Sequence, residues 1–378
     1  MEIDEDGRMR DEKEASVIMS KNKEKSMKVN LRFVPSSPVV KMLLMLIMAL
    51  ILVSMSSLSF ADKWVKKADM PIPRMLFGST IIDGTIYCIG GIKGLAIASE
   101  TSMDTYNPLK NTWEPKAKIN EARCWFVANE LNGKIYIMCG TPDGVNLMSS
   151  VEEYNPETNK WTFKKNIPNG TFAFSSAVLE GKIYVIGGAG NAPGIELNGV
   201  YAYDPISDTW QQKTNFPVQT DSASACACNG KIYHIGGVIN SNISSNVYEY
   251  EPAKDEWTQK TNMPTPRAGF SISIINGKIY AIGGHSPQGT VSVIDVYDPL
   301  QDKWIDQIQM TEGRSWHTSV VYQNKIYVMG GTHFYKGVGW PPQDVLSLVE
   351  EYTPDDWQFS INPQDKLSST WGKIEAGN

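Results

Sequence analysis

A recurring segment of this chain reads Asn276-Gly277-Lys278-Ile279-Tyr280-Ala281-Ile282-Gly283-Gly284. Asn-Gly between two apolar runs is typical of a β-hairpin turn, because both central residues of a type I′ turn need positive φ. Gly adopts such angles freely and Asn tolerates them. The segment therefore predicts that one strand ends near Ile275 and that another begins near Lys278.

Copies of this segment occur at a nearly constant spacing along the chain. The turn recurs at Asp83-Gly84, Asn132-Gly133, Glu180-Gly181, Asn229-Gly230 and, with Asn324 alone, before Lys325. Five of the six copies lead into a glycine pair: Gly90-Gly91, Gly187-Gly188, Gly236-Gly237, Gly283-Gly284 and Gly330-Gly331. In the remaining copy, Cys139-Gly140 takes the place of the pair. The starts of these pairs are 47 to 49 residues apart. A fixed period of this length indicates an internal structural repeat.

A second motif keeps the same period. A Tyr is followed seven positions later by a Trp, across a turn of the type Asn/Asp/Glu-Pro-x-x-Asn/Asp, at Tyr106/Trp113, Tyr154/Trp161, Tyr203/Trp210, Tyr250/Trp257 and Tyr297/Trp304. Pro presets φ at the second turn position, and Asp or Asn closes the turn through its side chain. We therefore expect Tyr and Trp to face each other across a second hairpin. Each unit is predicted to hold four strands.

Four short strands in each repeat of this length are typical of a β-propeller, in which every sheet is one blade around a central channel. Each Trp precedes the next glycine pair by 26 residues, and Trp64 precedes the first pair by the same 26. The spacing of Gly-Gly, Tyr and Trp resembles the kelch repeat from Trp64 to Tyr352. The resemblance implies an all-β, six-bladed kelch-type propeller with four antiparallel strands in each blade. It says little about function, since kelch propellers include both enzymes and binding scaffolds.

Ring closure is predicted to join the two ends of the repeat region. The sixth unit has Gly330-Gly331 and Tyr352, but Trp357 follows that Tyr by only five positions and without the usual turn. Trp64 has no Tyr of its own. We therefore expect the N-terminal strand around Trp64 to pair with residues 349–352, which removes an exposed sheet edge. On this prediction the propeller spans residues 62–356, and 357–378 form a C-terminal tail.

The first sixty residues differ from the repeat region. Residues 1–41 begin with many charges of both signs and little apolar periodicity, which predicts a disordered leader, with Met27 as a possible true start. Residues 42–61 then combine a preceding Lys41, a short apolar core and small residues before Asp62. These are the parts of a signal peptide, with cleavage expected after Ala61. The alternative is an uncleaved membrane anchor over residues 42–60, which is long enough to span a bilayer.

Charge and cysteine content restrict the possible partners. The formal net charge of −6 gives no reason to expect nucleic acid or an anionic membrane surface. The five cysteines are an odd and sparse set without the density of a disulfide scaffold: Cys88, Cys124, Cys139, Cys226 and Cys228. We expect them to be small apolar fillers in crowded strands. No cofactor is predicted, and the chain is expected to be a monomer.

Four arginines recur at one position of the repeat, ten residues after a Trp. They are Arg74, Arg123, Arg267 and Arg314, and the same position holds Thr171 and Thr220 in the other two units. Four guanidinium groups around the channel mouth would suit carboxylates or sugar hydroxyls. The alternative is structural, with each Arg donating hydrogen bonds to loop carbonyls of its own or the next blade.

The loop from Gly331 to Tyr352 is longer than its counterparts. It carries His333, Tyr335 and Trp340, and exposed aromatic side chains on a loop suit sugar stacking or a protein interface. A locally packed plug over the closure is the alternative. His317, three residues after Arg314, is expected on the same face. The spacing of the four histidines shows no metal-binding pattern, so no metal site is predicted.

Two functions are compatible with this sequence. The first is a binding module outside the cytoplasm, either secreted, periplasmic or at the cell surface, that recognises a protein or a glycan through one loop face. The second is a carbohydrate-active enzyme, because secreted kelch propellers include the galactose oxidases and the sialate mutarotases. The Cys, Tyr and His set of a copper site like that of galactose oxidase cannot be placed here. A mutarotase-like activity needs only one acid/base pair near an Arg, and the place expected for it is Arg314 with His317 or Glu312. The sequence favours the binding module.

Overall fold

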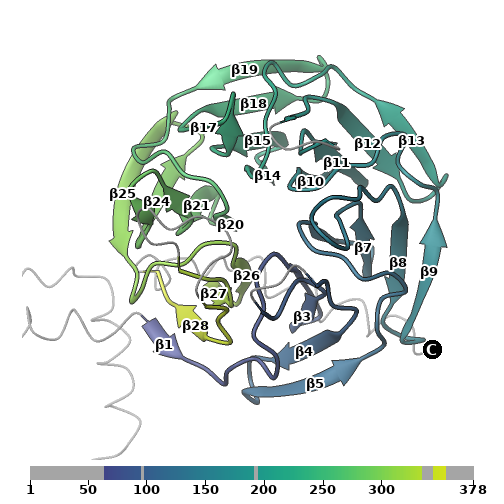
Figure 1. Ribbon diagram of the computed structural model, residues 1–378. Helices are drawn as coiled ribbons and strands as arrows, with labels where there is room; N and C mark the ends of the chain where they lie inside the picture. Colours follow the sequence, from purple (N-terminus) through teal and green to yellow (C-terminus); the bar gives the residue numbers. More distant parts are fainter. Residues whose placement is uncertain (1–63, 95–97, 191–194, 334–343, 355–378) are drawn as a thin grey trace, which may run out of the picture. The chain divides into compact units, whose positions relative to one another are not determined.

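The computed structural model describes residues 64–94, 98–190, 195–333 and 344–354. The described residues form six four-stranded antiparallel sheets, and Figure 1 shows that the sheets are arranged in a ring. The described residues contain no helix, and none of them belongs to a helix long and apolar enough to cross a membrane. The prediction of a six-bladed, all-β propeller is confirmed.

The first three blades follow the chain without interruption. Blade 1 contains β2 (Gly78–Ile82), β3 (Thr85–Ile89), β4 (Met103–Asn107) and β5 (Thr112–Lys116). Blade 2 contains β6 (Ala128–Leu131), β7 (Lys134–Met138), β8 (Val151–Asn155) and β9 (Lys160–Lys164). Blade 3 contains β10 (Ser175–Leu179), β11 (Lys182–Ile186), β12 (Val200–Asp204) and β13 (Thr209–Gln212).

The last three blades include two extra hairpins and the chain closure. Blade 4 contains β14 (Ser224–Cys228), β15 (Lys231–Ile235), β18 (Val247–Glu251) and β19 (Glu256–Lys260), with the hairpin β16 (Val238–Ile239) and β17 (Asn242–Ile243). Blade 5 contains β20 (Ser271–Ile275), β21 (Lys278–Ile282), β24 (Val293–Asp298) and β25 (Lys303–Gln309), with the hairpin β22 (His285–Ser286) and β23 (Gly289–Thr290). Blade 6 contains β26 (Thr318–Tyr322), β27 (Lys325–Met329), β28 (Val349–Tyr352) and β1 (Trp64–Lys66).

The Asn-Gly turns have the predicted geometry. Asn276 and Gly277 have φ of 51° and 72°, and Ile275 pairs directly with Lys278 across the turn. A side chain on most residues makes such angles costly, but Asn and Gly accept them. The turn therefore fixes the register of the first two strands in each blade.

The Tyr–Trp motif connects neighbouring blades. In blade 1 the Tyr106 and Trp113 rings lie 4.9 Å apart, and the Tyr106 hydroxyl donates to Asn111 Oδ1 at 2.7 Å. The same Asn111 oxygen accepts the backbone N–H of Ala68 at 2.7 Å, and the Trp113 indole N–H donates to the Ala68 carbonyl at 3.0 Å. Ala68 lies in the segment that enters blade 1 from the closure strand. The turn residue is thus selected both for its φ and for a bond between blades.

Ring closure follows the prediction. β1 pairs with β28 in antiparallel register, with Trp64 opposite Tyr352. The two rings lie 4.9 Å apart at 39°, compared with 4.9 Å and 37° for Tyr106 and Trp113. The Trp64 indole N–H donates to the Gln309 carbonyl at 3.1 Å. Trp64 therefore occupies in blade 6 the place that Trp113 occupies in blade 1.

Blades 2, 4 and 6 each contain a partly or fully buried glutamate that accepts hydrogen bonds from a Tyr and a Lys. Glu249 accepts from the Tyr233 hydroxyl at 2.6 Å and from Lys231 Nζ at 2.7 Å. Burial alone would raise the pKa of Glu249, but the hydrogen bonds from Lys231 and Tyr233 outweigh it and lower the pKa. The pKa values of Glu153 and Glu351 are lowered through the same balance.

A carboxylate whose pKa is lower in the folded state stabilises the fold above its unfolded pKa, and this contribution is lost as the pH falls. We expect the free energy of unfolding to decrease as the pH falls below about 4.5, the unperturbed value for Glu. The triple variant Glu153→Gln, Glu249→Gln, Glu351→Gln should be less stable at neutral pH and should lose less stability on acidification. Urea unfolding at a series of pH values measures both effects. An unchanged pH dependence in the variant would contradict this assignment.

Candidate functional site

The two faces of the propeller differ in what they display. In an antiparallel meander, the loop after the second strand and the loop into the next blade emerge on one face, here called the loop face. The Asn-Gly and Pro-x-x-Asn/Asp turns emerge on the opposite side, here called the turn face. The loop face includes residues 195–199 of blade 3 and the two extra hairpins of blades 4 and 5.

The four repeated arginines lie beneath the loop face with no exposed surface. In blade 2, Arg123 Nη1 donates to the carbonyls of Cys139 at 2.8 Å and Ser150 at 3.2 Å. Its Nη2 donates to Glu152 Oε1 at 2.9 Å, and the Glu152 side chain is also fully buried. Arg123 thus satisfies loop carbonyls and a buried carboxylate of its own blade.

The other three arginines repeat this arrangement. Their ion pairs are Arg74 with Asp104, Arg267 with Asp295 and Arg314 with Glu350. A buried charge needs a partner and hydrogen bonds. The carboxylate meets this need at Nη2 of each arginine, while Nε of Arg74 and Arg314 is buried without a hydrogen-bond partner among the described residues. Burial therefore argues against the predicted ligand contacts at Arg74, Arg123, Arg267 and Arg314 and favours the structural alternative.

The backbone forms a closed ring of hydrogen bonds at the channel mouth. Each blade contributes one residue to this ring, which lies two positions after the repeated Arg or, in blades 3 and 4, after the Thr that replaces it. Each N–H donates to the carbonyl of the equivalent residue in the preceding blade at 2.7 to 3.0 Å, and φ is 52° to 58° at Leu76, Trp125, Ala173, Ser222, Gly269 and Trp316. The bond from Leu76 N to Trp316 O joins the first blade to the last at 3.0 Å. Positive φ is unusual for bulky residues. The ring fixes the direction of their side chains at the mouth.

Aromatic side chains cluster on this ring. The Trp125 and Trp316 rings lie 6.3 Å apart at 87°, Phe172 lies 5.7 Å from Trp125, and His285 lies 5.3 Å from Trp316. These four residues, here called the mouth patch, are partly exposed. The indole nitrogen of Trp316 is itself buried and has no hydrogen-bond partner among the described residues. What the patch offers is therefore apolar aromatic surface.

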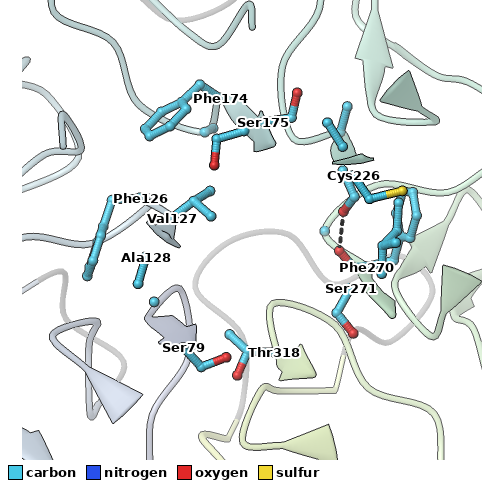
Figure 2. Close-up of a pocket in the computed structure, with 18 of the residues that line it drawn as sticks. Ser79, Phe126, Val127, Ala128, Phe174, Ser175, Cys226, Phe270, Ser271 and Thr318 are labelled. Atoms are coloured by element: carbon cyan, nitrogen blue, oxygen red, sulfur yellow. Dashed lines mark hydrogen bonds between the residues drawn. The ribbon is translucent and has the colours of Figure 1, made fainter. Parts of the chain in front are cut away.

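The channel below the mouth patch is a cavity of about 340 Å³ between the innermost strands of the six blades. Figure 2 shows Ser79, Ser175 and Thr318 around this cavity. Serine and threonine side chains thus contribute polar groups to the channel wall. Buried polar atoms in proteins nearly always have partners, yet the buried atoms Asn129 Nδ2 and Thr318 Oγ1 have none among the described residues.

His317 also lines the channel, and its side chain is buried. Its Nε2 lies 3.0 Å from Ser271 Oγ, while Nδ1 has no hydrogen-bond partner in the part of the chain that the structure describes. Burial, with a smaller contribution from Arg314, lowers the pKa of His317 to about 3. The ring is therefore neutral at pH 7, and only a ligand inside the channel can reach it.

The long loop of blade 6 is described at its two ends. His333 is partly exposed, its Nδ1 contacts Asp344 Oδ2, and its Nε2 lies 3.7 Å from Glu312 Oε2. Tyr335 and Trp340 lie outside the described residues, so their assignment as ligand contacts stays a prediction. The structure brings His333 close to Glu312 but places Arg314 and His317 below the surface.

The described ranges contain no group of three or more His, Cys, Asp or Glu residues that could hold a metal ion. The five cysteines are free and buried, and burial raises the pKa of Cys88 and Cys139 to about 12. The prediction that the cysteines are apolar fillers agrees with this burial.

Trp125 and Trp316 were not among the predicted site residues. Each lies two residues after a repeated Arg, where the other blades have Leu76, Ala173, Ser222 and Gly269. Comparison of the repeats at this one position would have identified both indoles as departures from the pattern. Their aromatic contacts with each other depend on residues almost two hundred positions apart.

Comparison with known proteins decides the family. The family model described as the KLHDC2/KLHL20/DRC7 Kelch-repeats domain matches residues 128–331, more than half of the chain. The chain belongs to the kelch-repeat family. A second family model, the Kelch motif, matches residues 73–119 of this kelch-repeat protein.

Curated relatives match short parts of this kelch-repeat protein. Kelch-like protein 28 of Homo sapiens is 35% identical over 85 residues, which are 21% of this chain and 15% of the relative. The Kelch repeat and BTB domain-containing protein A55 of Vaccinia virus (strain Western Reserve) is 37% identical over 76 residues, which are 20% of this chain and 14% of the relative. The matched segments therefore span only a small part of either relative.

A solved structure confirms the architecture. The structure of YjhT superimposes with a TM-score of 0.63 at 18% identity, covering 77% of this chain and 98% of YjhT. At this level of identity the likeness concerns the fold alone.

Proposed function

We propose that this kelch-repeat protein is an interaction module that binds a protein partner at the mouth patch. The observation that carries the proposal is the pair of partly exposed indoles, Trp125 and Trp316, held at the channel mouth by the hydrogen-bonded backbone ring. Large aromatic side chains on rigid positions are typical anchors of protein interfaces. Kelch-repeat domains generally mediate protein interactions, which agrees with this assignment.

The extra hairpins and the mouth patch lie on the same face, which supports the choice of that face. His285 belongs to β22 in the hairpin of blade 5 and contacts Trp316. In blade 4, the backbone N–H groups of Asn240 and Ser241 donate to Glu196 at 2.7 Å each, so this hairpin is tied to blade 3. Ordered loops on a rigid scaffold are suited to recognition.

We further propose that the protein acts outside the cytoplasm. The support is the sequence of residues 42–61, whose basic flank, apolar core and small residues match a signal peptide. Mass analysis of the mature protein would find Asp62 at its N-terminus. Retention of residues 42–60 would instead favour the membrane anchor.

The enzyme alternative has less support from the geometry. Arg314 is fully buried and paired with Glu350, and His317 is buried and neutral at pH 7. Glu312 is partly exposed, and its carboxylate lies 3.8 Å from Arg314 Nη2 and 3.7 Å from His333 Nε2. A general acid/base pair needs side chains that substrate can reach, and neither Arg314 nor His317 is such a side chain.

We expect Trp316→Ala to reduce partner binding by about 1 to 3 kcal/mol, the range of interface anchors. Binding can be measured by quantitative affinity capture from extracts of the source organism, followed by titration of each captured partner. Leu300→Ala is the matched control, because Leu300 is 84% exposed on the turn face. Thermal unfolding of both variants should remain close to that of the parent protein.

Three outcomes distinguish a protein partner at the mouth patch, recognition by the turn face and a carbohydrate at the mouth patch. Loss of binding in Trp316→Ala with retention in Leu300→Ala supports the mouth patch. The reverse pattern would assign recognition to the turn face. Binding to a glycan array that Trp316→Ala abolishes would replace the protein partner by a carbohydrate at the same patch.

A further inference from the structure

Blades 3 and 4 lack the buried ion pair of the other four blades. Strand register places Tyr201 of β12 where blade 2 has Glu152, and Tyr248 of β18 occupies the same place in blade 4. Thr171 and Thr220 occupy the positions of the arginines. Both members of the pair have therefore changed together in these two blades.

In blade 4, a larger apolar residue fills the space that the arginine leaves. Phe216 is buried, and its ring lies 4.2 Å from His234 and 4.9 Å from Tyr248. The same repeat position, four residues before the Arg or Thr, holds Ile119 in blade 2 and Ile167 in blade 3. Packing in blade 4 is thus restored by a change from an aliphatic to an aromatic side chain.

In blade 3 the space stays open. A cavity of about 230 Å³ is lined by Ile167, Asn169, Thr171, Asn198, Tyr201 and Gln212 among others. Asn169 and Gln212 are exposed, so the cavity opens to solvent at the rim of the propeller. Its volume is smaller than the roughly 300 to 1,000 Å³ of pockets for drug-sized ligands, which suits a single side chain or a small fragment.

The wall of this cavity contains the acceptors that bind arginine elsewhere in the molecule. Gly187 and Gly199 line it, and they are equivalent by register to Gly90 and Ser102 of blade 1. The carbonyls of Gly90 and Ser102 accept Arg74 Nη1 at 2.8 Å and 3.2 Å. In blade 3 the hydroxyl of the shorter Thr171 lies 3.3 Å from the Gly187 carbonyl oxygen and 3.2 Å from that of Ala189, and it can donate to only one of them at a time. Within the described residues, the Thr171 hydroxyl makes no hydrogen bond with the Gly199 carbonyl.

We propose that the blade 3 cavity binds the guanidinium group of an external ligand, which takes the place of the arginine that this blade lacks. A guanidinium carries planar N–H donors and is weakly hydrated, so it enters partly buried sites more readily than an ammonium. The two carbonyls accept it as they do in blade 1. The side chain of an arginine in a partner peptide and a free guanidine compound share this chemistry.

Blade 3 has Tyr201 in place of the carboxylate of Glu152, and this difference limits the affinity of the proposed site for a guanidinium. Tyr201 is partly exposed, and Asn169 Nδ2 donates to its hydroxyl at 2.8 Å. Its ring edge lies beside Gly199, since a Cβ added at Gly199 would lie 3.0 Å from Tyr201 Cε2. A bound guanidinium therefore has an aromatic ring and amide groups near it, and its charge stays partly hydrated at the open rim. This environment favours reversible binding over the permanent pairing seen at Arg123.

The test is a titration of the full chain labelled with ¹⁵N, followed at the backbone amides of Gly187 and Gly199. The probe is N-acetyl-arginine methylamide, and the matched control is N-acetyl-citrulline methylamide, which is neutral and of nearly the same shape. We expect saturable shifts with the arginine probe and none with citrulline. Absence of saturable shifts, or equal shifts with both probes, would overturn the proposal. Free L-arginine shows whether a peptide side chain or a small guanidine compound is preferred.

Three variants are used, so that the conclusion does not depend on the behaviour of any single variant. Ile167→Phe copies the packing of Phe216 in blade 4, and Thr171→Arg copies the arginine of blade 2, so each should abolish the shifts by filling the cavity. Tyr201→Glu copies Glu152 and should tighten binding at least about tenfold, since a hydrogen bond to a charged group contributes about 1.5 to 3 kcal/mol. Shifts that persist in both filled variants would show that the probe binds elsewhere.

This site is separate from the mouth patch. Trp316→Ala should leave the arginine titration unchanged, and Ile167→Phe should leave partner binding at the mouth unchanged unless the partner contributes an arginine to blade 3. The experiments can therefore contradict partner binding at the mouth patch without contradicting guanidinium binding in blade 3, and the reverse also holds.

Discussion

Glu152→Gln should lower the free energy of unfolding by about 3 to 5 kcal/mol, the range for a buried charge that loses its partner. Arg123 and Glu152 both have no exposed side-chain surface, and their contact of 2.9 Å lies beneath the loop face. Removing the carboxylate leaves Arg123 with the carbonyls of Cys139 and Ser150 and with Glu121, whose side chain is 45% exposed. Urea unfolding at neutral pH measures the loss.

The same molecule supplies the control and a compensating change. Asp69→Asn removes the partner of Lys66 in an exposed ion pair, and exposed pairs contribute about 0 to 1 kcal/mol. The double variant Arg123→Thr, Glu152→Tyr copies blade 3 and should be less damaging than Glu152→Gln alone, because no unpaired charge remains buried. If the single variant were as stable as the parent, the buried pair would not stabilise the blade.

Trp64→Ala should lower the free energy of unfolding by about 3 kcal/mol, the lower end of the range for loss of a core Trp, because this indole is only partly buried. The change removes the contact with Tyr352 and the bond to the Gln309 carbonyl. Both interactions hold β1 in blade 6, so the variant weakens the joint between the chain ends. Chemical denaturation of the full chain measures the effect.

Two further variants define what the closure depends on. Val65→Ala changes an exposed residue of the same strand, and surface substitutions usually alter stability by no more than about 0.5 kcal/mol. Trp357 lies outside the described residues. A greater loss for Trp357→Ala than for Trp64→Ala would assign the closure to the C-terminal segment instead of β1.

The paired substitutions among blades explain how the ring tolerates different interiors. Each blade needs the space beneath its loop face filled and its two loop carbonyls satisfied. An arginine with a carboxylate meets both needs in blades 1, 2, 5 and 6, whereas Phe216 fills the space in blade 4. Blade 3 meets neither need fully, and its cavity is the result.

The sequence alone determined the fold of this kelch-repeat protein. Asn-Gly turns, glycine pairs and the Tyr–Trp motif act over a few residues, and their repetition at a constant period leaves a closed ring as the simplest arrangement. The closure by Trp64 followed from the same spacing, because the sixth unit lacks a Trp at the expected place. These signals are local, so they can be interpreted without coordinates.

The tertiary structure alone decided which side chains are available for binding. The repeated arginines were recognisable, but Asp104 and Glu152 lie about 30 residues from their partners in the chain and vary between Asp and Glu, so neither the pairing nor the burial was visible. The mouth patch joins Trp125 to Trp316 across the ring, and the blade 3 cavity depends on the combined volumes of Ile167, Thr171 and Tyr201. Exposure and cavity volume arise from packing between segments distant in sequence, which a repeat pattern does not encode.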